Sequence, residues 1–208
     1  MITIIDLGIG NIGSVINMIK YIGGDCKVSS SPKEIKSASK LILPGVGSFD
    51  KAMNQLRNRE LEDVIVEKAT IDKVPLLGIC LGMQLLTNSS EEGKEKGLGL
   101  IQAETLSFKK EFNKQNIKER VPHMGWNDVF IQQNISLTEN LNEESLRFYF
   151  VHSYYVRCYN KENSLMKSSY GLDFDSAIIN DNIYGVQFHP EKSHKFGKEL
   201  LLNFLNIQ

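Results

Sequence analysis

Residues 74–86 read Val-Pro-Leu-Leu-Gly-Ile-Cys-Leu-Gly-Met-Gln-Leu-Leu, an apolar run that two glycines interrupt. A short apolar run of this kind is typical of a strand buried on both faces of a parallel sheet. Gly78 and Gly82 stand two residues before and two residues after Cys80, which is the pattern of a sharp turn from a strand into a helix. The stretch therefore predicts an α/β fold in which Cys80 stands at the carboxyl end of a buried strand.

The residues before this run alternate short β-branched stretches with amphipathic ones, as βαβ units do. We expect strands at Ile2 to Asp6, at Cys26 to Ser29 and at Lys40 to Leu43. The apolar spacing between residues 12 and 22 predicts a helix, and residues 50–70 predict one or two more. Ser31, Pro32 and Glu34 predict the capped start of a further short helix. The first half of the chain thus predicts a parallel sheet with helices packed against it.

The second half changes character, because residues 98–187 contain many short alternating runs. An Asn-Asp-Asn turn at residues 180–182 predicts a hairpin, so we expect antiparallel strands beside the parallel ones. The apolar side of residues 194–205 predicts a final helix docked on the core. The polar stretches 91–96 and 109–120 are interpreted as solvated loops. The predicted fold is an open sheet with a parallel core, flanking helices and added antiparallel strands.

Length and composition exclude several classes of protein. The 208 residues fit one domain, residues 1–208. The chain has 24 Lys and Arg against 25 Asp and Glu, so its net charge is −1. No basic tract is long enough to indicate nucleic-acid binding. Cys26, Cys80 and Cys158 are too scattered for a disulfide framework or a zinc knuckle, which favours a reducing compartment, the cytoplasm. The start of the chain and the broken apolar run at residues 74–86 favour neither a signal peptide nor a membrane span.

A possible nucleotide motif stands near the start of the chain. Residues 8–13, Gly-Ile-Gly-Asn-Ile-Gly, match G-x-G-x-x-G between an expected strand and an expected helix. A dinucleotide site also needs an acidic residue near the end of the second strand, to bind the ribose hydroxyls. Residues 28–31, Val-Ser-Ser-Ser, offer none, and Glu34 is assigned to a helix start. We therefore interpret residues 8–13 as a tight turn and expect no cofactor.

The turn predicted at Cys80 would give this thiol the chemistry of a nucleophile. A helix that begins at the next residue favours the thiolate, and the Leu81 N–H would point toward an oxyanion formed on an attacked carbonyl. The strained backbone of such a turn leaves room only for small residues on either side. The alternative is a buried structural thiol, which is our interpretation of Cys26 and Cys158.

A thiol nucleophile needs a base, and the base needs a group that orients it. His189 ends the apolar stretch 184–188 and is followed by a proline and Glu191. The carboxyl ends of parallel strands share one rim of a sheet, so the sequence predicts a triad of Cys80, His189 and Glu191. The alternative, a metal held by His189, Glu191 and His194, lacks a fourth ligand and a paired-histidine spacing.

A second donor to the oxyanion is expected from another loop. Residues 44–49, Pro-Gly-Val-Gly-Ser-Phe, follow a predicted strand, and their glycines free backbone N–H groups to point at a ligand. The alternative for this loop is an ordinary strand-to-helix turn.

Together these segments resemble the triad-type glutamine amidotransferases. Residues 44–49, residues 78–84 (Gly-Ile-Cys-Leu-Gly-Met-Gln) and residues 187–193 (Gln-Phe-His-Pro-Glu-Lys-Ser) stand in the order expected of that family. Within it, residues 122–127 (Pro-His-Met-Gly-Trp-Asn) and 150–156 (Phe-Val-His-Ser-Tyr-Tyr-Val) are similar to the glutaminase subunits of imidazole glycerol phosphate synthases, named HisH. The resemblance covers nearly the whole chain and implies the flavodoxin-like class I amidotransferase fold.

This resemblance implies a reaction. Cys80 would attack the side-chain amide of L-glutamine and release ammonia from a thioester, and His189, held by Glu191, would activate the water that releases L-glutamate. The residues that the resemblance assigns to the oxyanion site are Val46, Gly47 and Leu81, and those that it assigns to substrate binding are Gln84, Ser153 and Tyr154.

The resemblance also implies a partner. In that family the ammonia crosses to a (βα)₈-barrel cyclase subunit, which makes imidazole glycerol phosphate and AICAR in histidine biosynthesis, and the two subunits form a heterodimer. The residues expected at the interface are His123, Met124, Trp126, Asn127 and Lys192. Without the resemblance, Trp126 would be read as a core anchor and Lys192 as a solvated charge.

Several positions depart from the usual pattern of the histidine-pathway subunits. Leu7 stands where an aromatic residue is common, Gly13 where arginine is usual and Gln102 where proline is usual. None of them belongs to the triad. They leave open a paralogue that feeds ammonia to the amidination of a surface sugar. Two further hypotheses are a cysteine hydrolase of peptides or esters and a glutaminase-like scaffold without activity.

Overall fold

Five parallel strands form the centre of the molecule. The computed structural model describes residues 1–9, 12–141 and 145–207. The parallel strands are β1 (Ile2–Ile5), β2 (Cys26–Ser29), β3 (Leu41–Gly45), β4 (Leu76–Cys80) and β13 (Ile183–Val186). They lie in the order β2-β1-β3-β4-β13, which is the strand order of flavodoxin-like sheets. The α/β fold with a parallel core is confirmed.

Antiparallel strands extend this sheet beyond β13. They are β12 (Asp173–Asn180), β10 (Tyr154–Cys158) and β6 (Ala103–Ser107), with the two-residue β5 (Ser89–Ser90) parallel to β6 at the end. Beside them lie β11 (Ser164–Ser169) and β8 (Phe130–Ile131), and a separate pair is formed by β7 (His123–Asp128) and β9 (Arg147–His152). The hairpin predicted at residues 180–182 joins β12 to β13.

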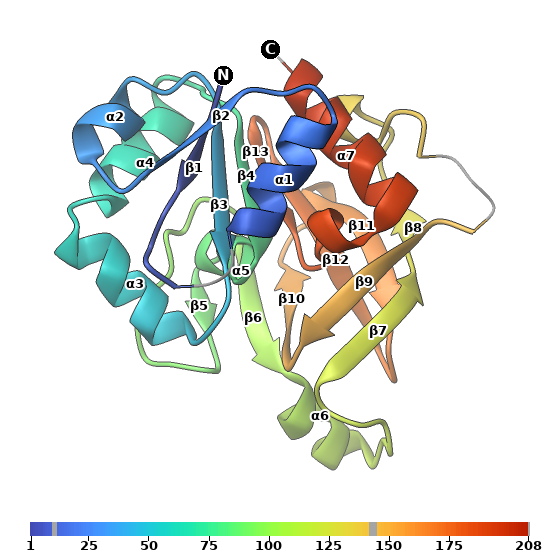
Figure 1. The fold of residues 1–208 in the computed structure, drawn as a ribbon. Helices are drawn as coiled ribbons and strands as arrows, with labels where there is room; N and C mark the ends of the chain where they lie inside the picture. Colours follow the sequence, from blue (N-terminus) through green and yellow to red (C-terminus); the bar gives the residue numbers. More distant parts are fainter. Residues whose placement is uncertain (10–11, 142–144, 208) are drawn as a thin grey trace.

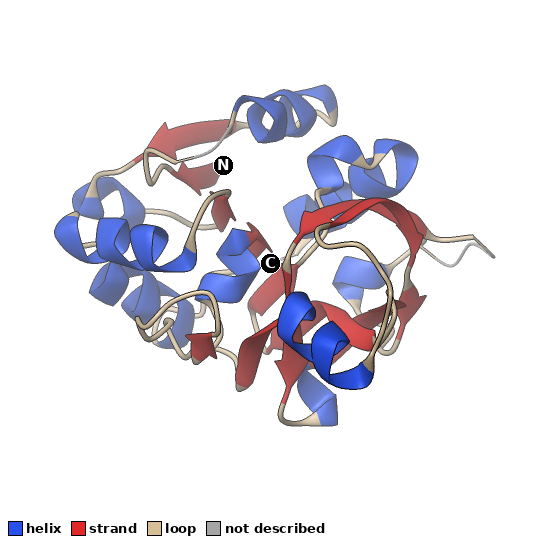
Figure 2. Ribbon diagram, turned by 90° about the horizontal axis from the view of Figure 1, so that it is seen from below, coloured by secondary structure: helices blue, strands red, loops and turns tan. Residues whose placement is uncertain are grey.

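Helices cover both faces of the parallel sheet (Figures 1 and 2). They are α1 (Gly13–Tyr21), α2 (Pro32–Lys36), α3 (Phe49–Asn58), α4 (Glu62–Thr70), α5 (Leu81–Leu85), α6 (Phe108–Gln115) and α7 (His194–Asn206), with short 3₁₀ turns η1 (Ser136–Thr138), η2 (Lys161–Asn163) and η3 (Pro190–Lys192). In Figure 1, α1 and α7 lie on one side, and α2, α3 and α4 lie on the other. None of the helices in the described part of the chain is long and apolar enough to span a membrane.

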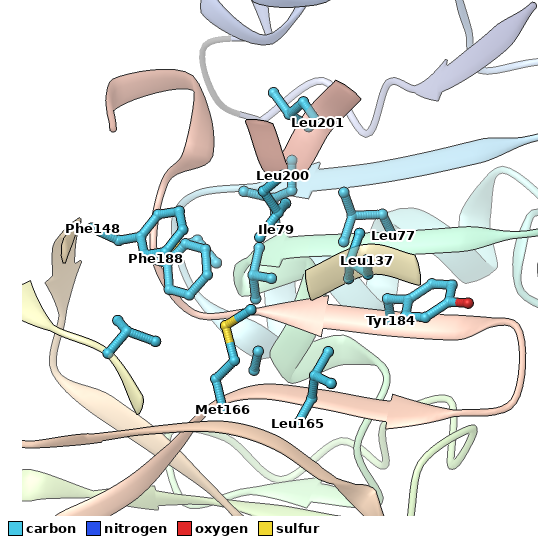
Figure 3. Packing of buried hydrophobic residues seen from close by; sticks show 14 of the residues in the cluster. Leu77, Ile79, Leu137, Phe148, Leu165, Met166, Tyr184, Phe188, Leu200 and Leu201 are labelled. Atoms are coloured by element: carbon cyan, nitrogen blue, oxygen red, sulfur yellow. The ribbon is translucent and has the colours of Figure 1, made fainter. Parts of the chain in front are cut away.

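Two hydrophobic clusters hold these layers together, one on each face. Along β3, Ile42 belongs to the cluster under α1 and α7, whereas its neighbours Leu41 and Leu43 belong to the cluster under α2, α3 and α4. This alternation follows from the two-residue period of a strand. Because both sides of β3 are buried, residues 41–43 are all apolar. Figure 3 shows Ile79 of β4 beside Leu200 of α7, and Leu77 belongs to the same cluster.

One predicted loop is a helix. The prediction of a solvated loop at residues 109–120 is wrong, because residues up to Gln115 belong to α6. Phe108 and Phe112 are buried one helical turn apart, and the Ser107 hydroxyl accepts a hydrogen bond from the Lys110 N–H at 3.3 Å. Two aromatic residues thus anchor a helix whose other side chains are polar. The apolar stripe is so narrow that the many lysines around it make the stretch resemble a loop in the sequence.

Side-chain contacts at Ser31 and at residues 91–96 differ from the predictions. The predicted hydroxyl cap at Ser31 is wrong, because its side chain makes no capping hydrogen bond, although Pro32 does begin α2. Residues 91–96 do form a loop, but it is fixed to α3: Asp50 accepts hydrogen bonds from the N–H groups of Lys94 and Glu95, each at 3.0 Å. This attachment matters because the loop borders the site.

Candidate active site

Cys80 stands on the sharp turn that the glycine pattern predicts. It joins β4 to α5 with φ 56° and ψ −110°, a conformation that costs a non-glycine residue energy. A Cβ on Gly82 would lie 1.8 Å from the Leu43 carbonyl oxygen, and a Cβ on Gly78 would lie 2.7 Å from the Gly82 carbonyl. Both glycines are therefore required by close backbone contacts. Because α5 has only five residues, its dipole alone gives a thiolate little stabilisation.

His189 and Glu191 meet at the end of β13, beside this turn. The imidazole Nδ1 lies 2.7 Å from Oε1 of Glu191, and the two side chains are only 4% and 5% exposed. The Ser193 hydroxyl donates to the His189 carbonyl at 2.6 Å and accepts from the Tyr149 N–H at 3.0 Å, which fastens this segment to β9. The imidazole is thus held in a fixed orientation.

The electrostatics of His189 favour its charged form. Burial disfavours the imidazolium, but the interactions with the Cys80 sulfur and with the hydrogen-bonded Glu191 carboxylate outweigh burial and raise the pKa of His189 to about 10. At neutral pH the His189 imidazolium therefore lies beside the Cys80 sulfur. This is the arrangement that makes a thiol a nucleophile.

A pocket of about 360 Å³ opens over Cys80. It is lined by Val46, Gly47, Cys80, Leu81, Gln84, Glu92, Pro122, Val151, His152, Ser153, Tyr154, His189 and Lys192. All six residues that the resemblance assigned to oxyanion and substrate binding line this one pocket with Cys80 and His189. Glu191 lies behind the imidazole, away from the opening. The residues that sequence reasoning missed are Glu92, Pro122, Val151 and His152.

Two amides lie behind the thiol. Gln84 Nε2 donates to Gln187 Oε1 at 3.0 Å, and Gln187 Nε2 lies 3.7 Å from the Cys80 sulfur. Gln84 is only 4% exposed, so most of its side chain supports the pocket wall. The motif at residues 187–193 contains Gln187 but does not predict its place behind the thiol.

The loop after β3 borders the pocket on another side. Gly45 pairs with Cys80 in the β3–β4 register, which carries Val46 and Gly47 to the rim. Gly47 has φ 112°, a conformation that glycine adopts far more readily than other residues. Val46 is 43% exposed and leaves the loop accessible. The loop is therefore placed where its backbone could approach a bound carbonyl.

Glu92 brings a carboxylate into the pocket wall. It accepts a hydrogen bond from the Phe49 N–H at 2.9 Å, and burial, with a smaller contribution from Asp50, raises its pKa. The polar stretch around Glu92 does not indicate a place in the site. The loop that carries Glu92 reaches the pocket only through its attachment to α3.

Four of the five residues expected at a partner interface lie on one strand and divide between its two sides. Residues 123–128 form the strand β7. Met124 and Trp126 face solvent, 62% and 40% exposed, as alternation along a strand requires. His123 is 3% exposed and cannot contribute to a surface, so the expectation for it is wrong. Asn127 is half-buried and donates to the Ser169 carbonyl at 2.9 Å.

Two further side chains extend this exposed area. The Trp126 ring stacks on His194 with centroids 5.4 Å apart. Lys192 is exposed, and its ammonium lies 5.9 Å from the centre of the Tyr149 ring. We call Met124, Trp126 and Lys192 the outer patch.

Two alternatives from the sequence were a metal site and a nucleotide site. Within the described ranges, no three His, Cys, Asp or Glu side chains are grouped as metal ligands. The G-x-G-x-x-G motif lies partly outside the described residues, at Gly10 and Asn11. Ile9 and Ile12 of the same turn line a cavity of about 20 Å³, which is room for a single water and not for a nucleotide.

Comparison with known proteins decides the family. The family described as Glutamine amidotransferase class-I matches residues 3–207. This chain belongs to the class I glutamine amidotransferases. It is 56% identical to the imidazole glycerol phosphate synthase subunit HisH 2 of Methanococcus maripaludis over 99% of this chain and 98% of that protein. It is also 47% identical to the protein of the same name from Pseudomonas aeruginosa, over the full length of both.

Solved structures agree on the fold of this class I amidotransferase. A structure of PurLQS from Thermotoga maritima matches with a TM-score of 0.76 at 17% identity, covering 99% of this chain and 97% of that one. A crystal structure of a glutamine amidotransferase matches with a TM-score of 0.75 at 19% identity, covering 98% and 96%. At these identities the likeness supports the architecture alone.

Proposed function

We propose that this chain is the glutaminase subunit of an imidazole glycerol phosphate synthase and hydrolyses L-glutamine to L-glutamate and ammonia. The observation that carries the proposal is Cys80, strained on its turn at the base of a pocket, beside an imidazole that Glu191 orients. The relatives at 56% and 47% identity are named as HisH subunits of that synthase, and they are matched over nearly their whole length.

The side chains divide the reaction between them. The Cys80 thiolate attacks the amide carbon of glutamine, and the carbonyl oxygen becomes an oxyanion that the Leu81 N–H and the loop of Val46 and Gly47 stabilise. His189 donates a proton to the leaving nitrogen, so ammonia departs and a thioester remains. A water molecule then gives a proton to His189 and attacks the thioester carbon, which releases glutamate and the thiolate.

The pocket suits the rest of the glutamine molecule. Its volume of about 360 Å³ is at the lower end of the range of small-molecule sites. Glu92 offers a carboxylate for the substrate ammonium group, and Ser153 and Tyr154 form part of the pocket wall that contacts the substrate. We assign Gln84 to the wall that aligns the substrate with Cys80.

The product must reach an acceptor without escaping to water. The names of the relatives describe subunits, and we infer that the partner is a (βα)₈-barrel cyclase subunit that turns ammonia into imidazole glycerol phosphate and AICAR. We assign the outer patch to this heterodimer interface. The whole of residues 1–208 serves as one glutaminase domain that needs no cofactor. The free thiols at Cys26, Cys80 and Cys158 suit the cytoplasm.

The test is glutamate release from glutamine by the purified chain, alone and with a cognate barrel subunit and its nucleotide substrate analogue. We expect stimulation by the partner and its ligand, and loss of hydrolysis in Cys80→Ala with partner binding retained. Hydrolysis that persists in Cys80→Ala would refute the mechanism. Stimulation only by a barrel subunit of a sugar-amidination pathway would reassign the acceptor, and turnover of esters or peptides without glutamine would reassign the substrate.

A further inference from the structure

Two buried histidines take no part in the mechanism above. His123 of β7 and His152 of β9 face each other in the β7–β9 register, and they are 3% and 6% exposed. Burial lowers the pKa of His123 to about 4 and that of His152 to about 3, so both rings are neutral at pH 7. A neutral imidazole has one donor and one acceptor, so its hydrogen-bond partners determine which nitrogen carries the proton.

The partners set one direction of donation through both rings. His152 Nδ1 lies 2.7 Å from the Tyr154 carbonyl, which can only accept, so Nδ1 carries the proton. His152 Nε2 therefore accepts from His123 Nδ1 at 2.8 Å. His123 Nε2 accepts in turn from the Asn127 amide at 3.2 Å. We call this series, Asn127 to His123 to His152 to the Tyr154 carbonyl, the histidine chain.

Aromatic rings hold the histidine chain in place. The His123 ring is stacked against Phe150, with centroids 4.8 Å apart, and against Tyr170, with centroids 4.1 Å apart. Phe174 lies 5.4 Å from the His152 ring, centroid to centroid. Close packing on these sides prevents the imidazoles from turning without moving the core. The direction of each donor is therefore fixed by packing as well as by hydrogen bonds.

The histidine chain ends at the wall of the pocket. His152, Ser153 and Tyr154 line the pocket, and the Tyr154 carbonyl lies 3.4 Å from Gln84 Nε2. Gln84 donates in turn to Gln187, whose amide lies 3.7 Å from the Cys80 sulfur. The carbonyl that His152 holds is therefore part of the hydrogen-bonded wall behind the nucleophile.

We propose that His123 and His152 are positioning residues, which fix the Tyr154 carbonyl and with it the wall of the glutamine pocket. The inference rests on the proposed function for the identity of the ligand. Alternation along β7 places His123 and Asn127 on its inner side and Met124 and Trp126 on its outer side. The same strand therefore supports the pocket on one side and carries most of the outer patch on the other.

Two substitutions of His152 separate positioning from general stability. His152→Asn places an amide N–H near the position of Nδ1 and can still donate to the Tyr154 carbonyl. His152→Gln places its amide near Nε2, so it can keep the contact with His123 but loses that donor. We expect His152→Gln to raise the KM for glutamine about tenfold with little change in kcat, the cost of one lost buried hydrogen bond. His152→Asn should recover most of this loss.

The same variants in a Cys80→Ala background give a binding measurement without chemistry. The Kd for glutamine, measured by calorimetry, should rise with KM in His152→Gln, and Asn127→Ala, at the half-buried end of the histidine chain, should give a smaller rise. A merely structural role would lower kcat through loss of folded protein and leave KM unchanged. Unchanged KM and Kd in folded His152→Gln would overturn the positioning role. No glutamine binding by Cys80→Ala itself would overturn the proposed function.

A spectroscopic measurement tests the hydrogen-bond direction in the unmodified chain. Nitrogen-15 NMR at pH 7 should show a protonated Nδ1 and a bare Nε2 on both His123 and His152. Protonation of either ring on Nε2 would overturn the histidine chain whatever the glutaminase activity.

Discussion

Single residues next to the nucleophile have almost no freedom to vary. A Cβ on Gly82 would overlap the Leu43 carbonyl oxygen, and a Cβ on Gly78 would press on the Gly82 carbonyl. These contacts involve backbone atoms, which cannot move aside as a flexible side chain can. The close approach of β3, β4 and α5 therefore determines the residue types around Cys80, and the chemistry of the site depends on that packing.

Gly82→Ala should lower the free energy of unfolding by about 3 kcal/mol, as overpacking of a tight site does. Gly23→Ala is the matched control, because Gly23 has φ 82° but no atom within 4 Å of an added Cβ. The control should lose only about 1 kcal/mol, from backbone strain alone. Urea denaturation of both variants measures the difference, and equal losses would show that the clash at Gly82 is relieved by a small shift.

Glu191→Gln should change stability in a pH-dependent way. The pKa of His189 is raised from 6.5 to about 10, so the charged imidazole stabilises the fold fully below about pH 6.5, and this contribution is lost as the pH rises through 10. Removal of the Glu191 charge should therefore destabilise the chain most near pH 6 and much less near pH 10.5. Cys80→Ala removes the other partner of His189 and should show the same trend. Denaturant midpoints at both pH values give the test, which a pH-independent difference would fail.

Helices α2 and α6 differ in how much the residue before their first turn contributes to stability. The start of α6 has a side-chain cap at Ser107, whereas the start of α2 has only a proline and an uncapped Ser31. Both serines precede a helix by one position and look equivalent in the sequence. The structure distinguishes them because only Ser107 turns its hydroxyl to a backbone N–H of the first turn.

Ser107→Ala should cost about 1 kcal/mol of unfolding free energy, the usual value of an N-cap. Ser31→Ala should cost no more than about 0.5 kcal/mol, as expected of a position whose side chain makes no capping hydrogen bond. Thermal unfolding of the two variants beside the unmodified chain measures the contrast. A larger loss at Ser31 than at Ser107 would contradict the assignment of the caps.

The sequence was informative where a local pattern carried the constraint. The strand before Cys80, the glycines beside it and the pair His189–Glu191 each lie within a few residues, so spacing alone predicted them. Residues brought together only by folding left no such signal. Glu92 reaches the pocket through its loop's attachment to Asp50, and His152 reaches His123 through the pairing of β7 with β9. His123 was placed on a surface because a single motif does not show which side of a strand is buried.

At the scale of the whole molecule, Trp126 is the exposed aromatic residue of the outer patch. Trp126→Ala should weaken binding of the barrel subunit about 30-fold, because a tryptophan at the centre of an interface is commonly worth 2 kcal/mol or more. Tyr21→Ala, which removes an exposed aromatic residue of α1, is the control and should leave the Kd unchanged. Calorimetric titration of each variant with the partner measures the effect. Equal affinities would move the interface away from the outer patch.

The thiol and its base come from distant parts of the chain. β4 ends at Cys80, but its parallel neighbour β13 begins only at Ile183 and is followed by His189. During synthesis the nucleophile therefore leaves the ribosome more than a hundred residues before its partner. A nascent chain in which β13 has not yet formed carries a thiol but no base to activate it. Hydrolysis of glutamine can begin only after His189 has been translated and β13 has paired with β4, so a chain that stops before β13 releases no ammonia.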